Sequence, residues 1–366
     1  MAKVVISGYY GFGNMGDEAI LAGLAEGFRR LAPSAQLTVL SKHPARTEAE
    51  HGLRAAPRDF LRAVRHARQC DLLLSGGGGL LQDATSWRSP LYYLGIIRAA
   101  AGAGVPVACV GQGIGPLGRR SIRALTRRAL AGAEVVTVRD HASAEVLREL
   151  GLDREVVVTA DLAFLLPTPT EAEVAAAWQK AELGEGSRGG LVVALRRPTG
   201  SAGSDLPRRL GRAIAAACDE VGMPATLFPM HHGVDLPFAE EVAGAIARSP
   251  AIVRHALSAR QSLALFAGFR LAVAMRLHAL VFACICGIPP VAVSYDPKID
   301  GLMAELGLRA ATSSRGFEEE ALIHGISDTW RRREEVAGSV QARLARLREA
   351  AALNLELVLP LLEARR

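Results

Sequence analysis

The chain has 366 residues, of which 50% are hydrophobic and 5% aromatic, and 43 basic against 37 acidic residues give it a formal net charge of +6. This length predicts about two domains with cores of their own, and the composition excludes an intrinsically disordered protein. The modest basic excess suits an anionic ligand or an anionic membrane surface. We expect no nucleic-acid partner, because the basic residues are not interleaved with aromatic ones.

The cysteines and the apolar runs indicate the compartment. The five cysteines form no C-x-x-C pair, so we expect buried free thiols in a reducing cytoplasm. The N-terminal segment MAKVVISGYY predicts a strand, and its apolar stretch is too short for a signal peptide. No apolar run reaches the length of a membrane span. We therefore expect a cytoplasmic protein.

From the N-terminus to residue 166, short runs of β-branched residues alternate with longer amphipathic stretches. The pattern predicts strands in KVVIS, QLTVLSK, DLLLS, VPVACV, EVVTV and EVVVTA, with helices between them. This alternation predicts a parallel sheet with helices on both faces.

The second half repeats the pattern after a break. Residues 167–190 are rich in Pro, Glu and Gly, and we interpret them as a linker. The strand–helix pattern restarts over residues 191–327, and residues 328–366 predict a long charged amphipathic helix. The expected fold class is therefore α/β, with two Rossmann-like domains (1–166 and 191–327), parallel sheets facing a cleft, and a closing C-terminal helix. Ligands of such folds bind at the carboxyl ends of the strands.

The loop after the first strand contains a G-x-G-x-x-G pattern at residues 11–16, which is typical of dinucleotide sites. Such sites also place an acid at the end of the second strand, where this chain has Ser-Lys-His at residues 41–43. Lys42 and Arg46 could instead accept a 2′-phosphate, so an NADP site stays open.

Polar residues follow these glycines at the start of the first helix. Asp17 and Glu18 would cap the helix, but they would also lie beside any bound anion, which is unfavourable for pyrophosphate and suitable for a sugar hydroxyl. We predict a functional role for Asp17 and leave both interpretations open for Glu18. Together with Gly13 and Asn14, they form a predicted acceptor-side loop.

Two more strand ends are rich in glycine, SGGGGLLQD at residues 75–83 and GQGIGP at residues 111–116. Glycine permits close approach of the backbone to a ligand or to a packed neighbour, and we favour a ligand. The predicted acceptor-binding residues here are Gly77, Gly78, Gln82 and Asp83. Arg139 and Asp161 end later strands. Arg139 is either a site residue or a solvated arginine, and Asp161 is either a site residue or a helix cap.

In the second domain, Arg196 and Arg197 follow a strand. Successive side chains point to opposite sides, so we expect one of them, Arg196, to reach a ligand. The segment FPMHHGVD (228–235) follows another strand, but adjacent histidines diverge, and we predict no metal site.

Arg276 and His278 stand where the strand RLAVA passes into an apolar helix, and Lys298 follows a further strand in SYDPK. Alternate residues share a side at such a junction, and both the arginine and the helix N-terminus favour an anion. These three residues are the sharpest sign of a site.

The motifs GYYGFGNMGDEAIL, SGGGGLLQD, GQGIGP, MRLHA and SYDPKIDGL, in this order, resemble the polysaccharide pyruvyl transferases, and most of all their bacterial cell-surface-anchoring (CsaB-type) branch. The resemblance extends from residue 4 to about residue 310. It implies a GT-B-like fold, phosphoenolpyruvate as donor, and a cyclic ketal formed across two hydroxyls of a sugar. In that branch the acceptor is an N-acetylmannosamine of a lipid-linked secondary cell-wall polysaccharide precursor, used in S-layer anchoring.

The resemblance also implies residue roles. Arg276 and His278 match the family's R-L-H motif, Lys298 matches its last lysine, and Arg139 matches an arginine of its first domain. Phosphoenolpyruvate carries two anionic groups and needs several cations, so we expect these residues and Arg196 to bind the donor. The imidazole would protonate the donor's methylene carbon as a general acid. Asp17 would orient or deprotonate the acceptor hydroxyl. No metal or organic cofactor is expected.

Three alternatives stay open: a GT-B glycosyltransferase that uses a nucleotide-sugar, an NAD(P) oxidoreductase, and a non-catalytic sugar- or phosphate-binding scaffold. A lipid-linked acceptor implies work at the inner membrane face. The basic run at residues 118–130 would touch anionic headgroups or a carrier pyrophosphate there, or form a solvated helix face. The sequence predicts no oligomeric state.

Overall fold

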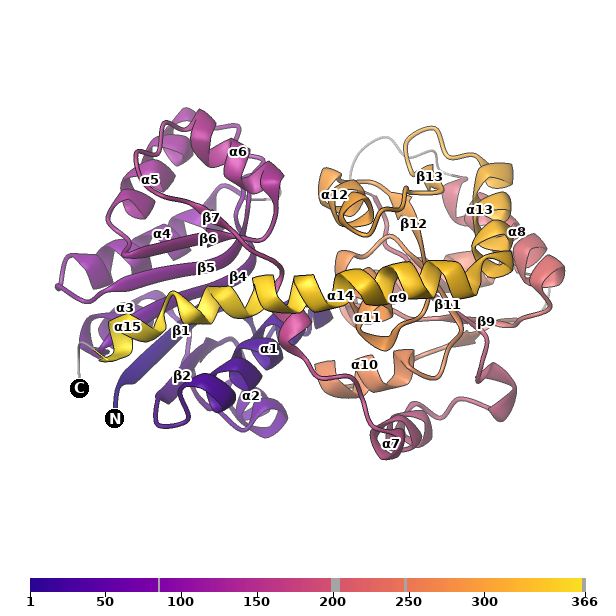
Figure 1. The fold of residues 1–366 in the computed structure, drawn as a ribbon, viewed down its shortest axis with the longest axis horizontal. Coiled ribbons are helices and arrows are strands. Elements are labelled where there is room, and N and C mark those ends of the chain that lie inside the picture. The colour runs from indigo at the N-terminus through magenta and orange to yellow at the C-terminus, as the bar shows by residue number, and fades with distance from the viewer. Residues whose placement is uncertain (85, 199–204, 247–248, 364–366) are drawn as a thin grey trace. The chain divides into compact units, whose positions relative to one another are not determined.

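The computed structural model describes residues 1–84, 86–198, 205–246 and 249–363 and divides the chain into two compact units (Figure 1). The first unit comprises Met1–Leu166 together with Arg346–Arg366, and the second comprises Pro167–Ala345. Each is built on one parallel β-sheet with alternating helices, as the strand–helix pattern predicts.

The sheet of the first unit has seven parallel strands in the order β3-β2-β1-β4-β5-β6-β7. The strands are β1 (Lys3–Tyr10), β2 (Gln36–Ser41), β3 (Arg54–Pro57), β4 (Leu72–Leu81), β5 (Val107–Ile114), β6 (Val135–Val138) and β7 (Val157–Val158). The helices are α1 (Met15–Leu31), α2 (Pro44–His51), α3 (Phe60–Gln69), α4 (Arg88–Ala101), α5 (Arg120–Ala131), α6 (His141–Glu149) and the 3-10 turn η1 (Leu162–Leu165). The chain reverses direction across the sheet between the neighbouring strands β1 and β4, which makes this the topological switch point.

The two glycine-rich segments that the sequence places in loops lie largely inside strands. Residues 76–79 belong to β4, and residues 111–114 belong to β5. A Cβ at Gly76 would lie 2.6 Å from the Tyr10 hydroxyl, and one at Gly77 would lie 2.8 Å from Ile20 of α1. These glycines therefore admit close packing, and the expectation of two ligand loops is corrected for this part of each segment.

The sheet of the second unit has six parallel strands in the order β10-β9-β8-β11-β12-β13. They are β8 (Leu191–Ala194), β9 (Ala225–Leu227), β10 (Ala251–Ile252), β11 (Leu271–Ala274), β12 (Pro290–Ser294) and β13 (Thr312–Ser313). The helices are α7 (Glu171–Ala181), α8 (Leu206–Val221), α9 (His232–Ala243), α10 (Ala259–Phe266), α11 (Leu277–Cys286), α12 (Pro297–Glu305) and α13 (Glu319–Arg331), with the 3-10 turn η2 (Glu185–Ser187). The switch point lies between β8 and β11.

The segments predicted as linker and closing helix are more divided than expected. Residues 167–190 contain α7 and η2 and belong to the second unit. The predicted single helix over 328–366 consists of the end of α13, then α14 (Arg333–Glu356) and α15 (Leu359–Glu363), while residues 364–366 lie outside the described residues. Pro360 has no N–H to continue the helix of α14, which accounts for the break before α15.

Helix α14 begins in the second unit and ends in the first. Its buried Asn354 connects it to the first unit's sheet, where its Oδ1 accepts hydrogen bonds from the hydroxyls of Thr137 and Thr159 (2.9 Å for Thr159). Its Nδ2 donates to the carbonyl of Ala160 at 3.2 Å. The Thr137 hydroxyl in turn accepts from the amide of Gly111 at 2.8 Å, so one side chain completes the polar contacts of two strands.

The cysteines are free in the structure, as expected, and Cys70, Cys109 and Cys284 are buried. Burial raises the pKa of the Cys109 and Cys284 thiols to about 12, so neither forms a thiolate at neutral pH. Within the described residues, no helix combines the length and the apolar character that a membrane crossing requires.

We predict that Asn354→Ala destabilises the protein by about 2 kcal/mol, because it removes the bonds that Asn354 makes to the buried Thr137 hydroxyl and the Ala160 carbonyl. The Thr159 hydroxyl keeps the Val138 carbonyl as an acceptor at 3.1 Å. Urea denaturation measures the change. Glu356→Ala, at an exposed position of the same helix, serves as the control and should alter the free energy of unfolding by less than about 0.5 kcal/mol. Equal effects of the two substitutions would contradict a special role for Asn354.

Candidate functional site

The predicted site residues gather at the carboxyl ends of the strands in each unit, around the two switch points. In the first unit, Ser7 of β1 is in register with Ser75 of β4. In the second unit, Ala194 of β8 is in register with Ala274 of β11. The crevice beside such a pair is where ligands of doubly wound sheets bind. Each unit is described by itself below.

The loop after β1 has the backbone that its glycines predict. Gly11 and Gly13 have φ angles of +78° and +73°, which favour glycine over any other residue. A Cβ at Gly11 would also lie 2.2 Å from the Ser41 hydroxyl. Asn14 caps α1, accepting from the amide of Gly16 at 3.4 Å. The loop is thus a tight turn that ends in a capped helix.

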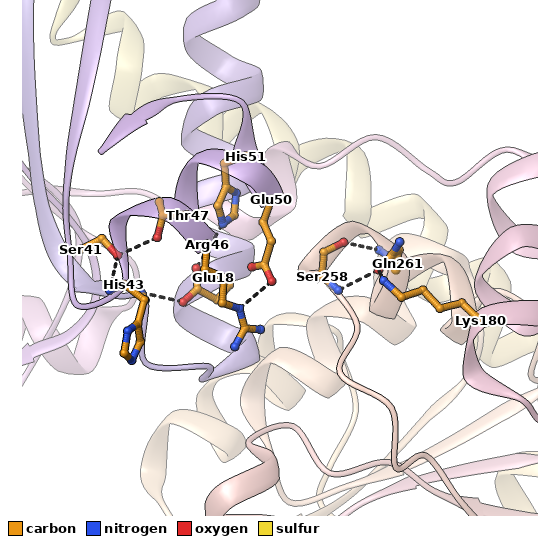
Figure 2. A network of polar contacts seen from close by, with 11 residues as sticks. Glu18, Ser41, His43, Arg46, Thr47, Glu50, His51, Lys180, Ser258 and Gln261 are labelled. Carbon is orange, nitrogen blue, oxygen red and sulfur yellow. Dashed lines mark hydrogen bonds and ion pairs between the residues drawn. The ribbon is translucent and has the colours of Figure 1, made fainter. Parts of the chain in front are cut away.

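Glu18 closes this turn from inside (Figure 2). One of its oxygens accepts the Gly11 amide at 2.9 Å, and the other lies 3.1 Å from Nε2 of His51. The side chains of Glu18 and His51 are both about 95% buried, at 5% and 4% exposure. The Glu18 carboxylate therefore already accepts the Gly11 N–H, a loop donor that the pyrophosphate of a dinucleotide would use. The open interpretation of Glu18 is corrected from acceptor contact to an internal bond of the loop.

Glu18, Glu50 and His51 are the potential metal ligands that the described part of the chain brings together, with ligand atoms within 4.8 Å of one another. Figure 2 shows that Glu50 also pairs with Arg46, at 2.7 Å. Both carboxylates therefore already have nitrogen partners, and we assign the three residues a structural role. The same figure draws a separate capping arrangement of the second unit, in which Ser258 and Gln261 cap α10 and Lys180 donates to Gln261 at 2.8 Å.

Asp17 lies at the switch point of the first unit. Its carboxylate accepts a hydrogen bond from the Asn14 amide group, and a Cβ at Gly78 would lie 2.8 Å from its Oδ1. Gly78, at φ +83°, is therefore the strand residue that makes room for Asp17. Burial, followed by the negative charge of Asp17, raises the pKa of Tyr9. The side chain thus places a negative field at this strand end.

Arg139 lies in the same unit, at the end of β6. Its guanidinium packs against Gly113, donates to Asp161 at 2.9 Å and lies 3.5 Å from Asp140. Burial lowers the pKa of Arg139, but Asp161 and Asp140 outweigh that effect and raise it. Arg139 stays charged, and its charge is compensated within the unit.

Gln82 and Asp83 shape the loops that follow β4 and β5. Asp83 accepts the amides of Gly118 and Arg119, both at 2.8 Å, and Gln82 accepts the amide of Ala84 at 2.9 Å. Burial raises the pKa of Asp83, but the two amide bonds outweigh it and lower the pKa. The carboxylate of Asp83 thus ties two loops together, and its contact with the acceptor stays a prediction.

In the second unit, Arg196 and Arg276 lie two residues after Ala194 and Ala274, the registered pair at the switch point. Arg276 occupies the N-cap position of α11, and its side chain binds one oxygen of Asp235 twice, through Nε at 2.8 Å and Nη2 at 2.6 Å. The same oxygen accepts the amide of His231 at 2.9 Å. Asp235 has no exposed surface, and its other oxygen is buried without a partner. Burial raises the pKa of Asp235, and the positive charge of Arg276 opposes that rise.

Arg196 and Lys298 both lie over the ring of Tyr295. Arg196 donates to the Tyr295 hydroxyl at 3.1 Å, and its guanidinium carbon lies 5.0 Å from the ring centre. The Lys298 ammonium lies 5.7 Å from the same ring centre and 3.0 Å from Asp296. Arg197 turns away, pairs with Glu241 and lies over the ring of Phe238.

His278 belongs to the first turn of α11, two residues after Arg276, and is half-buried. The structure therefore places Arg196, Arg276, His278 and Lys298 at the carboxyl ends of β8, β11 and β12. It places Asp17, Gly78 and Arg139 in the first unit. Three cations and an imidazole at the ends of neighbouring strands can bind a small molecule with two anionic groups and transfer a proton to it.

Sequence reasoning assigned no role here to Asp235 and Tyr295, and it left Asp161 undecided. Asp235 stood out only as a possible metal ligand beside two histidines. An acid in the first turn of a helix that follows a strand is the one signal that could have found it. The signal for Tyr295 was its position directly after the last residue of β12.

The fold is that of the two-domain GT-B enzymes. A UDP-GlcNAc 2-epimerase from Neisseria meningitidis superposes with a TM-score of 0.62 at 11% identity, with 98% of this chain and 100% of that chain covered. The MnaA protein of S. aureus, solved with UDP, gives 0.65 at 13% identity, covering 96% and 94%. The glycotransferase of kitacinnamycin gives 0.58 at 13% identity, covering 99% of both chains. At these identities the likeness concerns the fold alone.

The chain belongs to the polysaccharide pyruvyl transferase family, whose sequence model it matches over residues 14–297. The matched region begins after β1, includes Asp17 and the second unit's switch point, and ends one residue before Lys298. No curated protein matches the chain.

Proposed function

We propose that this protein transfers a pyruvyl group from phosphoenolpyruvate to two hydroxyls of a sugar, forming a cyclic ketal and releasing phosphate. The observation that carries the proposal is the gathering of Arg196, Arg276 and Lys298 around one switch point, beside His278. Phosphoenolpyruvate has a carboxylate and a phosphate close together, and each can accept two hydrogen bonds from one arginine.

Asp235 explains why this cluster suits a specific anion. It holds Arg276 by two bonds to one oxygen, so the guanidinium is fixed before any ligand binds. A fixed cation loses little conformational entropy on binding and contributes more to affinity than a mobile one. We assign the binding of the donor's phosphate and carboxylate to Arg276, Arg196 and Lys298 together.

The proposed reaction begins with a proton. His278 donates it to the methylene carbon of the donor, which becomes a methyl group, and positive charge develops at C2. A sugar hydroxyl attacks C2 and loses its proton, and the bond between C2 and the phosphate oxygen breaks, with the cations stabilising the leaving phosphate. The second hydroxyl attacks the same carbon, loses its proton and closes the ring. Of the two protons released by the hydroxyls, one restores His278 and the other leaves with the phosphate. The balance is one phosphoenolpyruvate and two hydroxyls to one ketal and one phosphate.

The first unit supplies the acceptor side of the proposal. Asp17, with Gly13, Asn14 and Gly78 around it, offers a carboxylate that accepts from a sugar hydroxyl. Arg139 remains a proposed contact to the donor, and like Arg276 and Lys298 it already pairs with a carboxylate of its own unit, here Asp161.

We further propose a lipid-linked cell-wall precursor ending in N-acetylmannosamine as acceptor, and a place at the cytoplasmic membrane face. This rests on the resemblance to the CsaB-type branch, whose products serve S-layer anchoring. The proposed steps need only protons and fixed charges, so neither a metal nor an organic cofactor is invoked.

Phosphate release tests the proposal. We expect release from phosphoenolpyruvate that depends on a lipid-linked saccharide acceptor, together with a mass gain of the acceptor equal to one pyruvic acid less one water. The alternative is a glycosyltransferase that uses a nucleotide-sugar, which the GT-B likeness of the kitacinnamycin glycotransferase favours. Transfer from labelled UDP-sugars, with no phosphate release from phosphoenolpyruvate, would support that alternative.

We predict that His278→Gln lowers the turnover number by about 10²- to 10⁴-fold, the usual contribution of a general acid. Donor affinity should change little, because the cations remain. Steady-state phosphate release gives the turnover number, and calorimetric titration with phosphoenolpyruvate gives the affinity. Near-normal turnover of the variant would rule out His278 as the acid.

Arg196→Ala and Arg197→Ala form a matched pair of neighbouring arginines. We expect the first to raise the KM for phosphoenolpyruvate by about tenfold or more, since a charged hydrogen bond contributes about 1.5–3 kcal/mol. The second should leave it within twofold, because Arg197 pairs with Glu241 instead. The same KM change in both variants would place the donor elsewhere.

A further inference from the structure

The positive charge of this chain is concentrated in one segment. Residues 58–128 contain 11 arginines and 3 aspartates, with no lysine or glutamate, a net charge of +8. The whole chain has a net charge of +6, so the remaining residues together are net negative. Such asymmetry indicates a surface for an anionic partner.

The structure spreads this charge over one face of the first unit. Helix α3 packs against α4, and α4 against α5 (Figure 1). We call their exposed arginines the basic face: Arg62, Arg65, Arg68, Arg88, Arg98, Arg119, Arg120, Arg127 and Arg128. Among the residues that the structure describes, one of these nine has a carboxylate within 4 Å, namely Arg62, which lies 3.5 Å from Asp59. The other eight have no carboxylate within 4 Å in the part of the chain that the structure describes.

Large apolar side chains are exposed on the same helices. Five large hydrophobic residues of the described chain are exposed, and three of them are Phe60 (47%), Leu61 (80%) and Trp87 (45%). We call these three the apolar rim. Phe60 contacts the ring of Tyr92 in α4 at 6.1 Å between centroids, so the starts of α3 and α4 are adjacent. Asp83 ties the loop before Trp87 to the amide of Arg119.

We propose that the basic face and the apolar rim dock the protein on an anionic phospholipid bilayer. The arginines would lie among the headgroup phosphates, while Leu61, Phe60 and Trp87 enter the boundary between headgroups and acyl chains. A nucleic acid would use the same charges, but Leu61 offers no stacking surface, and burying it in a bilayer removes its apolar area from water. We therefore infer a membrane surface.

This docking adds a surface to the proposed function and does not rest on it. The apolar rim stands at the N-terminal ends of α3 and α4, which follow the carboxyl ends of β3 and β4. Asp17 and Gly78 lie at this same edge of the sheet. A docked first unit would therefore present its candidate acceptor residues near the bilayer.

Co-sedimentation of the full chain with lipid vesicles tests the proposal, with no donor or acceptor present. Vesicles of phosphatidylcholine with about 30% of the anionic lipid phosphatidylglycerol should bind the protein. Vesicles of phosphatidylcholine alone should bind it at least tenfold more weakly.

Arg127→Gln with Arg128→Gln should weaken binding by about 25-fold, at about fivefold for each arginine removed from a membrane surface. Leu61→Ser should weaken it as well, and Trp87 fluorescence should shift to the blue on binding and lose that shift in Trp87→Phe.

Matched variants provide the controls. Arg309→Gln with Arg315→Gln removes two exposed arginines of the second unit and should leave vesicle binding within twofold, as should Leu61→Met. Equal loss in both arginine pairs, or equal binding to neutral vesicles, would overturn the proposal. Tight binding to single-stranded DNA that Leu61→Ser does not weaken, without vesicle binding, would identify a nucleic-acid surface instead. Because no phosphoenolpyruvate is used, a failure of the pyruvyl transfer leaves this result unaffected.

Discussion

The pairing of Asp235 with Arg276 is the interaction on which the second unit's candidate site depends. A carboxylate without exposed surface is costly unless it is paired and hydrogen-bonded, and here one oxygen receives two guanidinium bonds and one backbone amide. The arginine, in turn, stands at a fixed place beyond β11. The pair thus connects the first turn of α9 to the start of α11. The positive charge of Arg196 also lowers the pKa of Asp235, in the same direction as that of Arg276.

The strand–helix alternation and the charged residues at strand ends could be predicted from the sequence because they are local. An apolar run that ends in Arg-Leu-His shows both the strand and the polar side chains beyond it. Asp235 could not be assigned in this way, since its partner is 41 residues away and only the sheet brings the two together. The bond between Glu18 and His51 spans 33 residues and is hidden for the same reason.

The glycine-rich segments show a different limit. A run of glycines carries no side-chain periodicity, so the sequence cannot distinguish a loop from a strand against which α1 packs closely. Gly76 and Gly77 make room for tyrosine and isoleucine side chains, whereas Gly78 makes room for Asp17. One run therefore serves both packing and the candidate site. Helix α2 and strand β3 escaped prediction because neither PARTEAEH nor RAAP contains a large apolar residue that would give a periodic pattern.

The division of α14 between the two units affects how the protein is made. The ribosome releases residues 1–166 long before residues 346–366, because the whole second unit is synthesised in between. Until then Thr137 and Thr159 lack Asn354, and Gly27 lacks Leu355, the side chain that covers it. The first unit to emerge therefore lacks part of its packing until residues 346–366 have been synthesised.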